Sequence, residues 1–150
     1  MKNEMTLSEV SSDGFSGVSA RWMVVDDNED VLNSMALLLE RAGGGTVYRF
    51  RSAIKALEAF QADPAAWAVV VTDLEMPGLD GIKLGRQLRA LAPELKVFLT
   101  TGSCLITEEE AVQLGFRGLL YKPFRVSNLL RMILAGGTPD SGCVPDRVAA

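Results

Sequence analysis

Residues 67–81 read WAVVVTDLEMPGLDG and open with an apolar run that ends at Thr72, directly before Asp73. The run has no polar partner face, which is typical of a strand covered on both sides of a parallel sheet. An aspartate after a strand is more often a turn residue than a nucleophile, so Asp73 alone does not indicate a function. The stretch predicts a buried strand of a parallel sheet.

Apolar runs and helix-like segments alternate on both sides of this stretch. Further runs lie at residues 22–25, 46–50, 97–100 and 119–121. Apolar side chains recur with helical spacing in four segments, namely Leu32, Met35, Leu38 and Leu39; Ile54, Leu57 and Phe60; Leu84, Leu88 and Leu91; and Leu129, Leu130 and Ile133. With one more helix after Thr107, five strands alternating with five helices predict an α/β fold with an open, doubly wound parallel sheet.

Two of the predicted helices carry clear start signals. Thr107 and Glu110, three residues later, form a capping box, and Gly115 ends the helix that the box opens. Ser127 is the expected N-cap of the last helix.

The composition narrows the class of protein. With 15 Lys and Arg against 19 Asp and Glu the net charge is -4, so a basic nucleic-acid-binding footprint is missing. No apolar run approaches the length of a membrane span, and the two cysteines form no metal-ligand pattern. The chain has no histidine, which excludes a histidine-based triad, an imidazole zinc site and a phosphohistidine within it. We predict a cytoplasmic protein that binds neither nucleic acid nor membrane.

The 150 residues suit one domain with a core of its own, which we expect to span residues 21–135. Residues 1–20 are rich in serine and glycine without a sustained period, and they predict a mobile N-terminal arm. Residues 136–150 hold few large apolar side chains and predict a flexible C-terminal tail.

Polar residues stand at the carboxyl ends of four predicted strands. They are Asp26 and Asp27 at the first strand, Asp73 at the third, Thr100 and Thr101 at the fourth and Lys122 at the fifth. Each has a structural explanation when taken alone, because an aspartate pair usually caps a helix and a lysine before proline is usually a solvated charge. Ligands of such sheets bind beyond the carboxyl ends of the strands, so we expect the whole set at one ligand-binding rim.

The chemistry of this set predicts an acyl-phosphate site. Three carboxylates in one cleft raise each other's pKa unless a cation lies between them, and Mg²⁺ takes carboxylates, waters and phosphate oxygens as ligands. A carboxylate can act as a nucleophile and form an aspartyl phosphate, while a metal and the Lys122 ammonium offset the charge of the transferring group. The Thr101 hydroxyl is placed to donate to a phosphoryl oxygen, and Gly102 leaves room for that group.

Four stretches carry a resemblance to a known family. They are WMVVDDNED (22–30), TDLEMPGLDG (72–81), LTTGS (99–103) and YKPF (121–124). In this order and at these spacings they resemble the receiver domain of two-component response regulators, over residues 21–134. The resemblance implies the flavodoxin-like receiver fold, a five-stranded parallel sheet in the order 2-1-3-4-5.

The resemblance also implies a role for each residue of the rim. Asp73 would accept the phosphoryl group, Lys122 would pair with that group, and Thr101 would be the switch hydroxyl. Mg²⁺ would be bound by three side chains and one backbone carbonyl, those of Asp26, Asp27 and Asp73 and that of Glu75. Pro123 matches a family proline whose preceding bond is often cis.

One position departs from the family pattern. Family members often carry an aromatic residue three positions before the lysine, and its rotation follows the threonine. This chain has Leu119 there, and its tyrosine is Tyr121. Strand alternation puts Tyr121 on the face opposite to Lys122, so it need not replace the missing aromatic residue. We therefore expect phosphorylation without the usual threonine–aromatic coupling.

The leading hypothesis is a phosphoryl-accepting receiver of a two-component system or phosphorelay. It would be a switch and not an enzyme, at most promoting its own phosphorylation and slow dephosphorylation. The donor would be a phosphohistidine on a histidine kinase or histidine phosphotransfer protein in trans, because the chain has no histidine. A homodimer through the predicted fourth helix, fifth strand and fifth helix is a further expectation. A stand-alone receiver and a receiver segment of a larger hybrid sensor histidine kinase both stay open, with the first ranked slightly higher because the arm begins with Met1.

Three other classes of function are less favoured. A phosphatase with an aspartate nucleophile often has an acid two residues later, where Glu75 stands, but the aspartate pair at the first strand argues against it. An FMN or nucleotide binder needs a phosphate-cradling loop after the first strand, and this chain has two aspartates there. A phosphorylation-independent scaffold is weakened because every reactive position is present.

Overall fold

The computed structural model describes residues 20–42 and 45–135, and this part of the chain forms a five-stranded parallel sheet in the order β2-β1-β3-β4-β5. The strands are β1 (Arg21–Val25), β2 (Thr46–Phe50), β3 (Trp67–Asp73), β4 (Lys96–Thr101) and β5 (Gly118–Tyr121). The predicted α/β fold class and strand order are confirmed. The arm predicted for residues 1–20 lies outside the described residues except for Ala20, and so does the tail predicted for residues 136–150.

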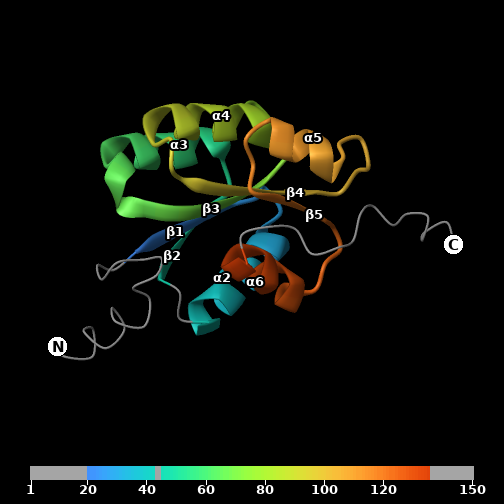
Figure 1. The fold of residues 1–150 in the computed structure, drawn as a ribbon. Helices are drawn as coiled ribbons and strands as arrows, with labels where there is room; N and C mark the ends of the chain where they lie inside the picture. Colours follow the sequence, from blue (N-terminus) through green and yellow to red (C-terminus); the bar gives the residue numbers. More distant parts are fainter. Residues whose placement is uncertain (1–19, 43–44, 136–150) are drawn as a thin grey trace, which may run out of the picture.

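In the described part of the chain, five α-helices connect and cover the strands. They are α2 (Glu29–Ala42), α3 (Ala53–Ala62), α4 (Gly81–Leu91), α5 (Glu108–Gln113) and α6 (Val126–Ala135), and a short 3₁₀ turn, η1 (Pro64–Ala66), leads into β3. Helices α3, α4 and α5 lie on one face of the sheet, and α2 and α6 lie on the other (Figure 1). This is the doubly wound arrangement, and in the described residues no helix combines the length and apolarity that a membrane crossing requires.

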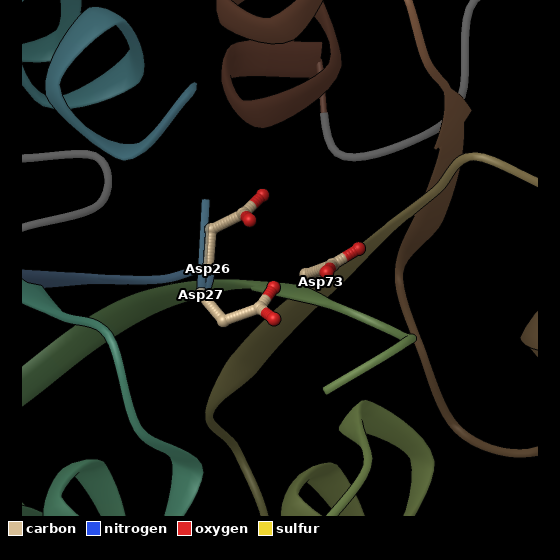
Figure 2. Close-up of side chains that lie close together, drawn as sticks. All are labelled: Asp26, Asp27 and Asp73. Carbon is tan, nitrogen blue, oxygen red and sulfur yellow. The ribbon is translucent and has the colours of Figure 1, made fainter. Parts of the chain in front are cut away.

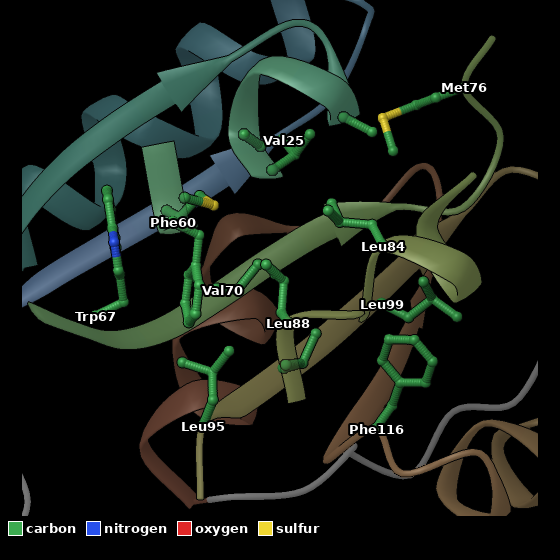
Figure 3. Close-up of a cluster of buried hydrophobic side chains, with 14 of the residues drawn as sticks. Val25, Phe60, Trp67, Val70, Met76, Leu84, Leu88, Leu95, Leu99 and Phe116 are labelled. Atoms are coloured by element: carbon green, nitrogen blue, oxygen red, sulfur yellow. The ribbon is translucent and has the colours of Figure 1, made fainter. Parts of the chain in front are cut away.

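The core is split by the sheet into two layers. One layer, under α3, α4 and α5, includes Phe60, Trp67, Leu84 and Phe116 (Figure 3). The other, under α2 and α6, includes Trp22, Met35, Phe98, Leu129 and Met132. Successive side chains of a strand point to opposite faces, so the central strands contribute to both layers. This explains why their sequences have no polar face.

Sequence predictions about three helices were wrong in detail. Leu91 was placed on the buried face of its helix, but 43% of it is exposed. Ile54 was placed on the buried face of its helix, but 51% of it is exposed, and α3 buries Ala53, Ala56 and Phe60 instead. The face of α3 that packs into the core is formed by these three residues, and Ile54 lies outside it. Ser127 was the expected N-cap of the last helix, but α6 already begins at Val126.

The α6 boundary follows from the backbone hydrogen bonds of its first turn. The amides of Asn128 and Leu129 both donate to the carbonyl of Arg125, at 2.9 and 3.3 Å. Ser127 therefore lies inside the first turn, where it cannot serve as the cap.

The predicted capping box at the start of α5 is confirmed. The Thr107 hydroxyl accepts from the amide of Glu110 at 3.0 Å, and the Glu110 carboxylate accepts from the amide of Thr107 at 2.9 Å. Gly115 follows the helix with a φ of 101°, a conformation that favours glycine. The helix after β4 is therefore fixed at both ends by local sequence.

Candidate functional site

Backbone hydrogen bonds continue past the last residues of the strands and bring the polar residues to one edge. The amide of Asp26, after β1, donates to the carbonyl of Phe50 at 3.0 Å. The amide of Lys122, after β5, donates to the carbonyl of Thr101 at 2.7 Å. The peptide bond between Lys122 and Pro123 is cis, as the resemblance implied. The two hydrogen bonds place Asp26 and Lys122 at the same edge of the sheet.

Three carboxylates gather at this edge. Asp26 and Asp27 follow β1 and Asp73 ends β3, and one oxygen of each lies within 4.8 Å of the others. Figure 2 shows the three side chains pointing into the same space. Asp26 and Asp73 are buried, with 0% and 2% exposed, whereas Asp27 is exposed. The structure thus brings together the three side chains that the sequence predicted as metal ligands.

Asn28, and not the aspartate pair, caps α2. Its side-chain oxygen accepts from the amides of Asp30 and Val31, at 3.0 and 3.1 Å. Asp26 accepts from the amide of Asn28 at 2.9 Å through Oδ1, which holds its carboxylate toward the cluster. The structural explanation of the aspartate pair as a helix cap is therefore wrong.

Lys122 is the cation of the cluster. Its ammonium lies 2.8 Å from Asp26 Oδ2 and 3.2 Å from Asp73 Oδ1. Burial would lower the pKa of Lys122, but the hydrogen bonds and charges of Asp26 and Asp73 outweigh burial and raise it. Lys122 is therefore positively charged at neutral pH.

Asp73 is held in an unfavourable environment for a carboxylate. Burial first, and then the charge of Asp26, raise the pKa of Asp73 from 3.8 to about 6, although the Lys122 ammonium opposes this rise. Asp73 Oδ1 faces that ammonium but has no hydrogen bond of regular geometry in the described part of the chain. The single positive charge of this ammonium therefore does not neutralise the three carboxylates.

The cluster therefore fits a hard divalent cation. Carboxylate oxygens are the ligands that Mg²⁺ prefers, and it commonly uses one or two of them with waters and phosphate oxygens. The underused Asp73 Oδ1, with the exposed Asp27 beside it, offers such ligands. The backbone carbonyl of Glu75, implied by the resemblance as a further ligand, stays a prediction.

The start of α4 packs closely against the backbone of Asp73. The amide of Gly81 donates to the carbonyl of Leu74 at 2.9 Å, which closes the loop after β3. A Cβ atom on Gly81 would collide with the backbone carbonyl of Asp73, so a glycine is required for this close approach. These two contacts hold the loop 74–80 next to the carboxylate cluster.

Thr101 lies at the rim, and its hydroxyl is hydrogen-bonded to Glu75. The buried Thr101 side chain, at the end of β4, donates to Glu75 Oε2 at 2.5 Å. Burial would raise the pKa of Glu75, but hydrogen bonds from Thr101, Gly102 and Ser103 outweigh burial and lower it. The side chain of Glu75 is therefore an ionised partner of the predicted switch hydroxyl.

Two contacts of the rim were missed by the sequence predictions. Glu75 entered them only through its backbone carbonyl and as a candidate acid, and nothing in the sequence pointed to a bond with Thr101. Tyr121 was set aside, but its hydroxyl donates to the carbonyl of Ile106 at 2.7 Å. That bond ties the end of β5 to the loop between β4 and α5.

The comparisons with known proteins agree with this geometry. The family model of the response regulator receiver domain matches residues 22–134. The transcriptional regulatory protein DctD of C4-dicarboxylate transport, from Rhizobium meliloti, is 38% identical over 109 residues, which are 72% of this chain and 23% of DctD. The chain thus spans about a quarter of that relative's length.

Two solved structures extend the likeness to three dimensions. The beryllofluoride-activated NtrC4 receiver domain dimer is 27% identical, with a TM-score of 0.70, over 77% of this chain and 94% of that one. A response regulator from Burkholderia pseudomallei, solved with a phosphorylated aspartic acid, a calcium ion and citrate, is 28% identical, with a TM-score of 0.65. The match covers 74% of this chain and 64% of the Burkholderia chain.

Proposed function

The chain belongs to the response regulator receiver domain family of two-component signalling, and from this premise we propose that Asp73 accepts a phosphoryl group from a phosphohistidine of a partner protein. One carboxylate oxygen of Asp73 attacks phosphorus and forms the new O–P bond, while the N–P bond to the histidine of the donor breaks. The imidazole leaves with the electron pair of that bond. The observation that carries the proposal is the contact of the buried Asp73 carboxylate with Lys122 at 3.2 Å.

Each charged residue of the rim has its own electrostatic role in this transfer. The Lys122 ammonium stands where charge develops on the transferring group, and its raised pKa keeps it positive. Asp26, which shares that ammonium at 2.8 Å, holds it in place. A bound Mg²⁺, held by Asp26, Asp27 and Asp73 with the carbonyl of Glu75, would neutralise charge on the phosphoryl oxygens. The Burkholderia relative, with its phosphorylated aspartic acid and calcium ion, supports this assignment.

A small phosphodonor tests the proposal without knowledge of the partner. Acetyl phosphate with Mg²⁺ should add one phosphoryl group to the chain, measured by intact mass, and chelation of the metal should suppress the addition. Asp73→Ala should abolish it, whereas Asp63→Ala, an exposed aspartate at the end of α3, should leave it unchanged. Equal labelling of Asp73→Ala and wild type would reject the assignment.

We infer that the partner in trans is a histidine kinase or a histidine phosphotransfer protein and that both meet this chain in the cytoplasm. The dimeric NtrC4 receiver supports a homodimer, which we place on the face formed by α5, β5 and α6. Whether the receiver acts alone or within a hybrid histidine kinase is decided by the length of the native protein. A mass measurement of the protein from its source cells distinguishes the two.

A phosphatase is the second candidate, because Glu75 stands two residues after Asp73. Its general acid would have to hold a proton at neutral pH, but the three donors around Glu75 lower the pKa of this carboxyl. We therefore propose a phosphoacceptor that at most promotes its own phosphorylation and slow dephosphorylation. Steady turnover of p-nitrophenyl phosphate by the wild type, lost in Asp73→Ala, would favour the phosphatase instead.

A further inference from the structure

We propose that the Glu75 carboxylate is a positioning residue that holds the Thr101 hydroxyl away from Asp73 until a phosphoryl group displaces it. The proposal rests on the phosphoacceptor function of Asp73. It concerns the side chain of Glu75 and is independent of any role of its backbone carbonyl. In the structure the Thr101 hydroxyl donates to Glu75 Oε2 at 2.5 Å.

The competition follows from the number of protons on a hydroxyl. Thr101 has a single O–H to donate, and Glu75 Oε2 at 2.5 Å is a much closer acceptor for it than the carbonyl of Ser103 at 3.5 Å. A phosphoryl oxygen on Asp73 would need the same proton if Thr101 is the switch hydroxyl. Each donation excludes the other, so the energy of the bond to Glu75 is subtracted from the energy gained at the phosphoryl group.

Glu75 holds more than one atom of the segment that follows β4. Its Oε1 accepts from the amide of Gly102 at 3.3 Å, and its Oε2 also accepts from the Ser103 hydroxyl at 3.1 Å. The Thr101 hydroxyl oxygen in turn accepts from the amide of Ser103 at 3.1 Å. One carboxylate therefore holds the Thr101 hydroxyl, the Gly102 amide and the Ser103 hydroxyl at the start of the loop between β4 and α5, and its release would remove these three hydrogen bonds.

The far end of this loop is held by a different group. The Tyr121 hydroxyl donates to the carbonyl of Ile106 at 2.7 Å, and the capping box begins at the next residue, Thr107. Between the two attachments Leu105 is 89% exposed. The contacts of Ile106 and Thr107 thus hold the far end of the loop independently of Glu75.

Charge gives the displacement its direction. Glu75 is already close enough for its charge to act unfavourably on the Asp73 carboxylate, and a phosphoryl group carries more negative charge than that carboxylate. Phosphorylation therefore strengthens the competing acceptor for Thr101 and increases the repulsion of Glu75 at the same step. Activation of the wild type therefore breaks one charge-assisted hydrogen bond, the one between Thr101 and Glu75.

A double-mutant cycle with beryllofluoride as phosphoryl mimic tests the proposal. Affinity is measured by isothermal titration in saturating Mg²⁺ for wild type, Glu75→Ala, Thr101→Ala and the double variant. We expect Glu75→Ala to bind about tenfold more tightly than wild type, the equivalent of one lost charge-assisted bond. In the Thr101→Ala background the same change should give a clearly smaller gain, because the hydroxyl that Glu75 restrains is gone and only the relief of charge repulsion remains.

Two further variants separate the effect of the Glu75 hydrogen bond from the general effect of removing a negative charge. Glu75→Gln keeps an acceptor without the charge, so its affinity should lie between those of wild type and Glu75→Ala, and it serves in the cycle if Glu75→Ala does not fold. Glu109→Ala removes an exposed carboxylate of α5 and should bind as wild type does. An equal gain with and without Thr101, or no gain in either glutamate variant, overturns the proposal. Failure of the wild type itself to bind beryllofluoride would instead reject the phosphoacceptor function.

Discussion

The Lys122 ammonium lies 2.8 Å from Asp26 Oδ2, although 96 positions separate the two residues in the sequence. Asp26 follows β1 and Lys122 follows β5, and β3 and β4 lie between these two strands in the sheet. The ion pair therefore bridges most of the rim. The Asp26 side chain is fully buried, whereas 21% of the Lys122 side chain is exposed. The pair therefore has a structural role in the unphosphorylated protein as well as a place in the proposed transfer.

Removal of the ammonium should destabilise the metal-free protein. Lys122→Met leaves the buried Asp26 carboxylate without its cation, and such a loss costs about 3 kcal/mol, near the lower end for buried pairs because Lys122 is partly exposed. Urea unfolding in EDTA measures the change. Lys55→Met, at an exposed position of α3, is the matched control and should unfold as the wild type does. Coincident unfolding of Lys122→Met and the control would show that the pair contributes nothing.

Mg²⁺ should stabilise the folded protein. A ligand that binds only the folded state adds about 2.7 kcal/mol at a hundredfold excess over its dissociation constant, and the acidic cluster exists only in that state. Thermal melting with and without millimolar MgCl₂ should therefore show a clear rise in Tm. Asp27→Asn should lose most of the rise. A wild-type Tm that does not respond to Mg²⁺ would contradict the metal site.

The raised pKa of Asp73 predicts a pH-dependent stability in the absence of metal. In the folded state Asp73 binds its proton with a pKa of about 6, above the ordinary value of 3.8. Proton binding at Asp73 therefore stabilises the folded state at low pH, and this stabilisation is lost as the pH rises through 6. Asp73→Asn does not titrate, so it should exceed the wild type in stability by about 3 kcal/mol at pH 8. This advantage should shrink toward zero near pH 4. Urea titrations in EDTA at several pH values provide the measurement, and a constant difference would refute the burial effect.

Thr101 and Lys122 should differ in how strongly they transmit the arrival of the phosphoryl group. We expect Thr101→Ala to be phosphorylated but to show smaller changes in amide exchange over residues 105–116. Lys122→Ala should lose more of the response, because a charge-assisted contact is stronger than a neutral hydroxyl bond. With Leu119 in place of an aromatic residue, Leu119→Tyr should alter the response only mildly. Exchange with and without beryllofluoride measures all three, and a full response in Thr101→Ala would assign the switch to another group.

The sequence alone predicted the sheet and the placement of the rim correctly, for a physical reason. Five short apolar runs separated by helical segments admit few topologies, and parallel strands bring all their carboxyl ends to one edge. The convergence of Asp26, Asp27, Asp73 and Lys122 then follows from their places just after the runs. The capping box at Thr107 was equally predictable, because both of its bonds are local.

The details that the sequence missed depend on tertiary packing. Ile54 and Ala53 are both apolar, and the way α3 packs into the core decides which of them is buried. The bond between Glu75 and Thr101 joins residues 26 positions apart, one in the loop after β3 and the other at the end of β4. No periodicity or capping rule describes such a contact, because it depends on how the two strands are paired in the sheet.

The site of phosphorylation is the central claim, and chemical trapping measures it most directly. Borohydride reduces an acyl phosphate to an alcohol, with loss of the phosphate, so a phosphorylated aspartate becomes homoserine. After reaction with acetyl phosphate and Mg²⁺, borohydride treatment and peptide mass mapping should find homoserine at position 73 in the wild type and none in a sample that saw no phosphodonor. Homoserine at position 26 or 27, or a phosphoryl group that survives the reduction, would contradict Asp73 as the phosphoacceptor.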